Sequence, residues 1–247
     1  MRHALWIVIA TACGRYGFHP AGDAPTAPGD AAGLDADAPI DAEAGTTPFV
    51  VQTSAMFATA SSVTATCAAT RQGSALVVAT ASVFVQDPVT AVSDDVGNVY
   101  VSAASQYTCT TTATLGELWY SPNARAGATA VTVTSAGSEQ REVWLLEIAN
   151  ADPVTPIDNA QVVNDGMTDG ATVVSPAVTP SSLPSVVLSV ANVPSSVGAL
   201  VGTQFTSLPT LFGDDAAYTL ATIAGNYGAV WTDTTAGQFC SRSVAIR

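Results

Sequence analysis

Two residue types that carry much of enzyme chemistry are missing from most of this sequence. From Phe49 to Arg247 there is no histidine and no lysine; the two histidines, His3 and His19, precede this region, and all seven basic residues are arginines. General-base catalysis, activation of a serine and Schiff-base chemistry depend on such side chains. This excludes a Ser-His-Asp triad or a Ser-Lys variant from the region. We therefore expect no catalytic residues and a protein that is not an enzyme.

Carboxylates are the catalytic groups that remain. Asp214 and Asp215 could be read as the acid and base of a glycosidase-type hydrolase, which needs two carboxyl groups facing each other at a separation of about 5 to 10 Å. Adjacent residues of a strand point to opposite faces, so these two cannot share that work. A carboxylate-based hydrolase is kept only as the last alternative.

Acidic pairs could also bind calcium through their oxygen atoms. The segment Asp94-Asp95-Val96-Gly97-Asn98 joins two predicted strands and offers three such side chains, Asp94, Asp95 and Asn98. The same residue types are those that tight turns select, and the spacing does not match a calcium loop. A turn is the preferred interpretation, with no cofactor. Other weak calcium candidates are Asp165 with Asp169 and Asp214 with Asp215.

Four aromatic residues could bind a ligand. Exposed in a row on a sheet, Trp119, Tyr120, Trp144 and Trp231 would form a stacking platform for sugar rings, whereas buried they are the large residues of a core. Alternation places Trp119 and Tyr120 on opposite faces, so at most one of them can join a given platform. The core interpretation is favoured, and a carbohydrate-binding domain is the first alternative function.

Three cysteines lie in the same region. Without histidine, Cys67, Cys109 and Cys240 are too few and too far apart in the sequence for a tetrahedral zinc site. In an exported protein two of them would form a disulfide that stabilises the fold by about 3 kcal/mol. We expect Cys67 to pair with Cys109 or Cys240; the alternative is three reduced, buried thiols.

Short β-rich runs separated by Gly, Pro, Asn and Asp must position these residues. Val131 and Val133 alternate with Thr132 and Thr134, which predicts one buried and one solvated face. The pattern predicts an all-β, antiparallel two-sheet β-sandwich in one domain, residues 48–247. The predicted strands are Val50–Met56, Ser62–Ala68, Ala75–Phe84, Val89–Ser93, Val99–Ser105, Gly116–Tyr120, Thr129–Thr134, Val143–Ala149, Thr172–Thr179, Ser185–Ala191, Tyr218–Ala224, Gly228–Thr232 and Phe239–Ile246.

Several of these runs carry a resemblance to a known group of proteins. They are Ser-Ser-Val-Thr-Ala-Thr-Cys from Ser61, Val-Ser-Asp-Asp-Val-Gly-Asn from Val92, Glu-Leu-Trp-Tyr-Ser-Pro-Asn from Glu117, Ala-Thr-Ala-Val-Thr-Val-Thr from Ala128, Asp-Pro-Val-Thr-Pro-Ile-Asp from Asp152 and the closing Ser-Val-Ala-Ile-Arg. Their order resembles secreted bacterial β-sandwich domains of immunoglobulin-like or jelly-roll character. Most members have no known function, so the resemblance implies a fold rather than an activity.

The N-terminus has the features of an export signal. Arg2 and His3 precede an apolar run, Ala4–Ala12, of signal-peptide length, and residues 1–12 end in Ala-Thr-Ala before Cys13. This resembles the lipobox of bacterial lipoproteins, which implies lipid attachment at Cys13, although Ala10 stands where the family prefers Leu. The alternative is a plain secretory leader. Residues 13–47 then form an acidic spacer rich in Ala, Asp, Pro and Gly, which cannot bury enough surface to order itself.

Charge narrows the choice of partner. The chain has a formal net charge of -13 and only 11% charged residues, so it repels phosphate backbones and is not expected to bind nucleic acid. We expect an exported protein of the bacterial cell envelope, an outer-membrane lipoprotein facing outward or into the periplasm, or otherwise a secreted protein. Its expected role is a non-enzymatic binding or structural module, with the membrane as partner through the lipid and possible contacts to a surface protein or glycan.

Overall fold

The computed structural model describes residues 47–82, 87–103, 107–108, 115–168, 172–193, 196–233, 235 and 237–247. The predicted all-β class is confirmed, because the regular elements of these residues are all strands. The strands are β1 (Phe49–Thr66), β2 (Ala75–Ser82), β3 (Val89–Asp94), β4 (Val101–Ser102), β5 (Tyr107–Thr108), β6 (Leu115–Ser121), β7 (Ala130–Ala149), β8 (Ile157–Thr168), β9 (Thr172–Val174), β10 (Ser185–Asn192), β11 (Val197–Leu200), β12 (Thr206–Ser207), β13 (Asp215–Ala221), β14 (Val230–Asp233) and β15 (Gly237–Ile246).

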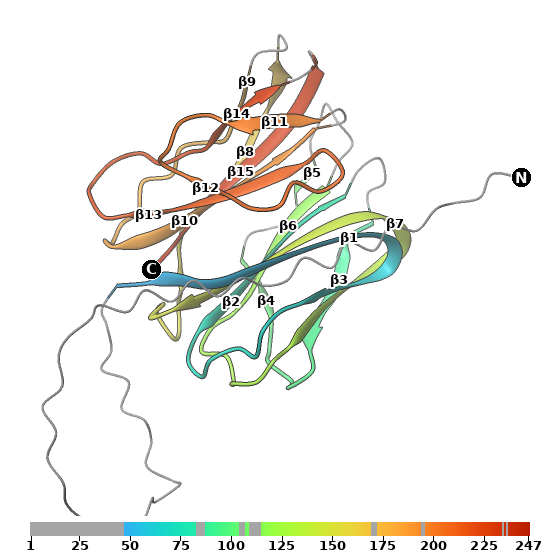
Figure 1. Ribbon diagram of the computed structural model, residues 1–247, viewed down its shortest axis with the longest axis vertical. Coiled ribbons are helices and arrows are strands. Elements are labelled where there is room, and N and C mark those ends of the chain that lie inside the picture. Colours follow the sequence, from blue (N-terminus) through green and yellow to red (C-terminus); the bar gives the residue numbers. More distant parts are fainter. Residues whose placement is uncertain are drawn as a thin grey trace, which may run out of the picture.

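The described strands pair in three antiparallel sheets. A seven-stranded sheet has the order β1-β7-β2-β6-β4, with β3 also paired to β7 and β5 to β6. A five-stranded sheet follows, in the order β12-β13-β10-β15-β8, and a three-stranded sheet has the order β11-β14-β9. Figure 1 shows most strands up to β7 in one half of the molecule and most later strands in the other half.

Two long strands, β1 and β7, form a ribbon that bends. Their antiparallel register shifts between Val50 and Gln52 and again between Ala60 and Ser62, and such bulges bend a strand and increase its twist. The two halves of β1 approach each other, since Ser54 Oγ in the first half donates to the carbonyl of Thr66, its last residue, at 2.6 Å. The bend encloses a core inside the seven-stranded sheet, formed by Val63, Ala65, Leu76, Val78, Val89, Val92, Tyr100, Ala124, Val131, Val133, Val143 and Leu145.

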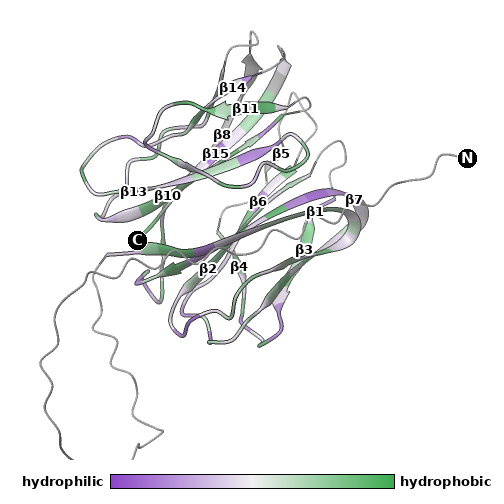
Figure 2. Ribbon diagram, viewed as in Figure 1, coloured by the Kyte–Doolittle hydropathy of each residue, from purple (hydrophilic) through white to green (hydrophobic). Residues whose placement is uncertain are grey.

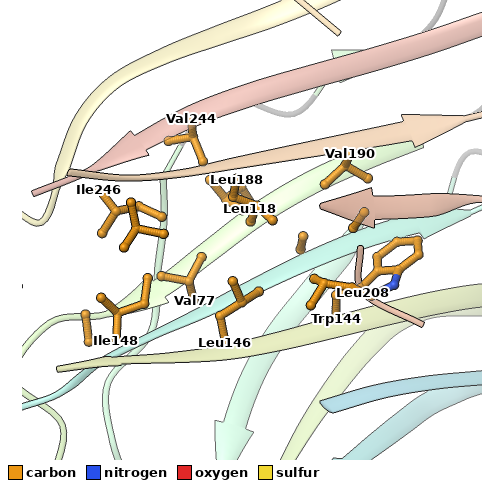
Figure 3. Packing of buried hydrophobic residues seen from close by; sticks show 14 of the residues in the cluster. Val77, Leu118, Trp144, Leu146, Ile148, Leu188, Val190, Leu208, Val244 and Ile246 are labelled. Atoms are coloured by element: carbon orange, nitrogen blue, oxygen red, sulfur yellow. The ribbon is translucent and has the colours of Figure 1, made fainter. Parts of the chain in front are cut away.

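A second core joins the seven-stranded and five-stranded sheets. Trp144, Leu146 and Ile148 of β7 and Val77 of β2 face Leu188 of β10 across it, together with Val244 and Ile246 of β15 (Figure 3). All eight residues of β2 and all eight of β10 are buried, because each strand lies in the middle of its sheet and is covered on both faces. The inter-sheet core therefore holds the two halves of the molecule together.

A third core lies between the five-stranded and three-stranded sheets. Val187, Ala217 and Ala245 face it from the five-stranded sheet, while Val173 and Trp231 come from the three-stranded sheet. Side chains of β10 thus alternate between two cores, as the period of a strand requires. The stack has three sheets in the described residues, one more than the predicted two-sheet sandwich.

The predicted alternation in β7 is confirmed. Val131 and Val133 are fully buried, whereas Thr132 and Thr134 are half-buried, and Thr132 shares a hydroxyl hydrogen bond of 2.9 Å with Thr64. The sequence had indicated separate strands at 129–134 and 143–149, but β7 continues through the polar residues between them. Figure 2 shows this hydrophilic stretch within β7, and it leads to the candidate site.

Candidate functional site

Charged residues are buried on both faces of β7. Arg141 and Glu142 are adjacent and both have no exposed surface. Because successive residues of a strand point to opposite faces, Arg141 points to the side of the core inside the bent ribbon, and Glu142 points to the inter-sheet core with Trp144. Two charge clusters therefore lie back to back across one strand.

The first cluster is a network of opposite charges. The Arg141 guanidinium contacts the Glu139 carboxylate and donates to the Asp87 backbone carbonyl at 2.5 Å. Glu117 of β6 accepts a hydrogen bond from the Val89 amide at 2.7 Å. Burial raises the pKa of Glu117 and of Glu139 and lowers that of Arg141, while attraction between the guanidinium and the two carboxylates opposes each shift.

The second cluster is a pair of acids. Glu142 and Asp214 are both completely buried, and Asp214 Oδ1 accepts a hydrogen bond from the Val193 amide at 2.8 Å. No N–H or hydroxyl group of the described residues reaches either Glu142 oxygen or Asp214 Oδ2. Each acid interacts with the side chain of the other, and a hydrogen bond between two carboxyl groups needs a proton on one of them.

The pKa shifts favour Glu142 as the protonated member of the pair. Burial raises the pKa of both acids, and for Glu142 the neighbouring Asp214 charge raises it further. For Asp214, the hydrogen bonds from Glu142 and from the Val193 amide partly offset the effect of burial, because they stabilise the ionised form. A single proton on the pair makes it a carboxylic acid beside a carboxylate, with one negative charge in total.

A tight turn places Asp214 against Glu142. Leu211 and Asp214 form a two-way backbone bridge, with N···O distances of 3.0 and 2.7 Å, and the two residues between them have positive φ, 42° at Phe212 and 105° at Gly213. Two successive positive φ angles are typical of a hairpin turn of type I′. A bulky residue rarely adopts this conformation, so Phe212 is held there by its surroundings.

The same turn also contacts β1. The Phe212 ring stacks on Phe57, with centroids 4.7 Å apart and planes inclined by 5°. Phe57 lies directly opposite Glu142 in the β1–β7 register. The turn Leu211–Asp214 thus makes two contacts with one cross-strand pair, ring to ring and acid to acid. Nearby, Trp144 Nε1 donates to the Pro209 carbonyl at 2.9 Å and fixes the segment that leads into the turn.

Asp215 points away from Asp214, as predicted for adjacent residues. It accepts hydrogen bonds from the Ala216 amide at 2.8 Å and from Ser207 Oγ at 3.2 Å, and burial raises its pKa to about 6. Sequence reasoning excluded Asp214 with Asp215 as a facing pair but missed that Asp214 faces Glu142. The signal that could have indicated it is the run Glu139-Gln-Arg-Glu142 directly before an apolar strand.

Two of the four aromatic candidates are enclosed in cores, as the favoured interpretation predicted. Trp144 and Trp231 have no exposed surface and belong to two different cores. Trp119 and Tyr120 are half-buried and pack against different cores, on opposite faces of β6 as the alternation predicted. These side chains are core residues because each sheet of the stack is covered by another layer.

The Asp94–Asn98 segment is a turn closed by its own hydrogen bonds. Asp94 accepts bonds from the Asn98 amide at 3.0 Å and the Tyr100 hydroxyl at 3.0 Å, and Asp95 accepts from the Thr129 hydroxyl at 2.5 Å. Partial burial alone would raise the pKa of Asp94, but these bonds outweigh it and lower the pKa. Donors thus occupy the oxygens proposed for calcium, and the described residues contain no group of three metal-binding His, Cys, Asp or Glu side chains.

The remaining predicted site residues are placed as follows. Cys67 carries a thiol whose Sγ donates to the Ala128 carbonyl at 3.7 Å, so the bridge predicted through Cys67 is not formed. Cys240 is fully buried in β15. Cys13, Cys109 and Asp169 lie outside the described residues, and of Asp165 only the backbone, paired with Cys240, is described.

Comparisons with known proteins give no information about the site, which is interpreted from its chemistry alone. No protein-family model, curated protein or solved structure matches the chain. Within the described part of the chain, no helix has the length and apolar character needed to cross a membrane.

Proposed function

We propose that this protein is a non-enzymatic binding or structural module of the bacterial cell envelope, exported and anchored by lipid at Cys13. The observation that carries the proposal is that the charged side chains able to do chemistry are buried between the sheets. The acids Glu117, Glu139, Glu142 and Asp214 and the cation Arg141 are buried and bonded to one another or to the backbone. They act in packing the sheets rather than toward solvent.

The two alternative functions have less support. A carbohydrate platform needs coplanar exposed aromatics, and Trp144 and Trp231 are enclosed in separate cores. A carboxylate hydrolase needs room between its acids for a substrate or an attacking water. Glu142 and Asp214, the acids that face each other, are in direct contact and fully buried. The module interpretation requires neither arrangement.

The sequence before the folded part supports an envelope location. The apolar run before Cys13 supplies an export signal, and residues 14–47 supply an acidic spacer that would hold the module away from the membrane surface. Gly14, rather than Asp, after the cysteine favours the outer membrane by the sorting rule of the lipoprotein family.

Metabolic labelling tests the anchor. The full-length protein is produced in a Gram-negative host fed an alkyne fatty acid, beside a Cys13→Ser variant and a matched Cys67→Ser control. We expect label and membrane association in the wild type and in Cys67→Ser, and loss of both in Cys13→Ser. Intact mass on the membrane fraction gives the attached groups. An unlabelled soluble species in the wild type would contradict the anchor.

A further inference from the structure

The turn Leu211–Asp214 is held on the seven-stranded sheet by contacts of two different kinds. The Phe57–Phe212 stack is apolar and partly open to solvent, with Phe212 53% exposed. Glu142 and Asp214 are fully buried and interact through their side chains, and that interaction is a hydrogen bond only while one acid carries a proton. One contact is therefore independent of pH, and the other depends on a single proton.

Among the described residues, no positive charge compensates the acid pair. β1, β2 and β10 contain no charged residue, and β13 contributes only Asp215, whose negative charge opposes ionisation of Asp214. Arg242 of β15 donates through Nη1 to the Gly116 carbonyl at 3.3 Å, and its charge acts on Glu117. On β7, the charged residues Glu139, Arg141 and Glu147 point to the other face of the strand.

We propose that this turn is a proton-dependent latch. One proton shared between the Glu142 and Asp214 carboxyl groups holds the turn on β7, and loss of that proton releases the turn. In the opening step the O–H bond of Glu142 breaks, the proton passes to water or hydroxide, and the charge of the pair changes from -1 to -2. Two carboxylates in contact in an apolar setting repel each other, so the contact separates.

Release of the turn has a defined structural consequence. Asp214 also accepts the Val193 amide hydrogen bond, and the Pro209 carbonyl accepts from the Trp144 indole, so both bonds are lost when the segment lifts. Phe212 leaves its positive φ of 42°, which favours opening once the acid contact is gone. The end of the inter-sheet core at Trp144 then becomes accessible. The module is closed in acid and opens in alkali.

Hydrogen exchange of single amides tests the latch. Protection factors, which correct for the intrinsic effect of pH, are measured at about pH 6 and about pH 10 for the amides of Val193, Leu211 and Asp214, with Leu188 in the centre of β10 as reference. We expect protection at the three amides to fall by at least about tenfold at the higher pH, and that of Leu188 to change far less.

Two variants make the result specific. In Glu142→Gln the amide donates to Asp214 at every pH, so we expect the three amides to stay protected. Glu147→Gln changes a buried acid of the same strand that points to the other face and is bonded to Ser74 and the Arg71 amide, and it should behave as the wild type. If Glu142→Gln does not fold, Asp214→Asn is read in the same way. Equal loss of protection in wild type and Glu142→Gln, or none in the wild type, would overturn the latch.

Discussion

The two faces of β7 hold buried charge in two different ways. On one face Arg141 is surrounded by Glu139 and Glu117, so cation and anions compensate one another. On the other face Glu142 lies against Asp214 without a cation, and a bound proton reduces the negative charge of the pair instead. The residues that set this difference, Arg141 and Glu142, are neighbours in the sequence.

The comparison shows that the cost of burying charge can be offset in two ways, and that only one of them depends on pH. An ion pair keeps its charges over the whole physiological pH range, and its desolvation cost is constant. A shared proton removes most of that cost but only while the proton is bound, so the contact reports pH. The interactions on one face of β7 are thus independent of pH in the physiological range, and the acid pair on the other face depends on pH.

The largest effect is expected from removing the cation. Arg141→Ala leaves Glu139 buried without a partner charge and Glu117 with the charge of Arg242 alone, and breaking a buried pair in this way costs about 3–5 kcal/mol. The free energy of unfolding from urea titration measures it. Arg125→Ala, at an exposed arginine, is the control and should change stability by less than about 0.5 kcal/mol. Similar small losses in both variants would remove the distinction between the faces.

The second largest effect is expected in the dependence of the free energy of unfolding on pH. Glu142, Asp214, Asp215, Glu117 and Glu139 have raised pKa values, so the folded state binds more protons than the unfolded chain above about pH 4. Their contribution is complete below that pH and is lost as pH rises through the folded pKa values, which for Asp215 is about 6.

Acids with lowered pKa act in the opposite direction. Hydrogen bonds lower the pKa of Asp94, Asp95 and Asp152, so their contribution is present above about pH 4 and lost below it. We expect stability to peak in mild acid and to decline by about 2 kcal/mol or more toward alkaline pH. Glu142→Gln should flatten the alkaline part. A flat wild-type profile from pH 5 to 9 would contradict the proton-bound face.

Phe212 provides a smaller effect that sharpens the same comparison. Phe212→Ala removes the stack on Phe57, which is worth about 1 kcal/mol, and leaves a non-glycine residue at positive φ. Phe212→Gly loses the same stack but accepts that φ without strain. Urea midpoints should rank wild type above Gly, and Gly at or above Ala. A loss larger than that of Arg141→Ala would show that the ring, not the charges, holds the turn.

Calcium should have the smallest effect. The oxygens of Asp94 and Asp95 already accept hydrogen bonds from Asn98, Tyr100 and Thr129. Adding millimolar calcium or a chelator is therefore expected to move Tm by less than about 1 °C. A calcium-dependent rise that disappears in Asp94→Asn would show that these oxygens bind the ion instead.

Much of the fold could be predicted because local patterns were enough. The strands around Ala75, Ser185 and Phe239 read as β-branched and alanine-rich runs, and they are β2, β10 and β15. Ser135–Glu142 lacks that composition, with a glycine and three charged residues, and becomes strand through pairing: Ser135 pairs with β3, Glu139–Glu142 with β1, and Arg141 and Glu142 also with β2. Tertiary pairing decided that segment, as it did for β8, which was not predicted.

The site could be predicted only in part for the same reason. That Asp214 and Asp215 face apart follows from the period of a strand. That Asp214 meets Glu142 depends on how the five-stranded sheet stacks on the seven-stranded one, and no local pattern carries that placement. Burial of Trp144 and Trp231 likewise follows from how the sheets stack, because Trp144 lies between the seven-stranded and five-stranded sheets and Trp231 between the five-stranded and three-stranded sheets.

The most direct test of the account is the protonation state of Glu142 itself. Carbon-13 NMR of the side-chain carboxyl groups, in protein labelled at glutamate, follows each acid through a pH titration, and the Glu142 signal is assigned by its absence in Glu142→Gln. We predict that this carboxyl is protonated at neutral pH and titrates only in the alkaline range. A Glu142 signal that titrates near the ordinary glutamate value of about 4.3 would contradict the shared proton and with it the distinction between the two faces of β7.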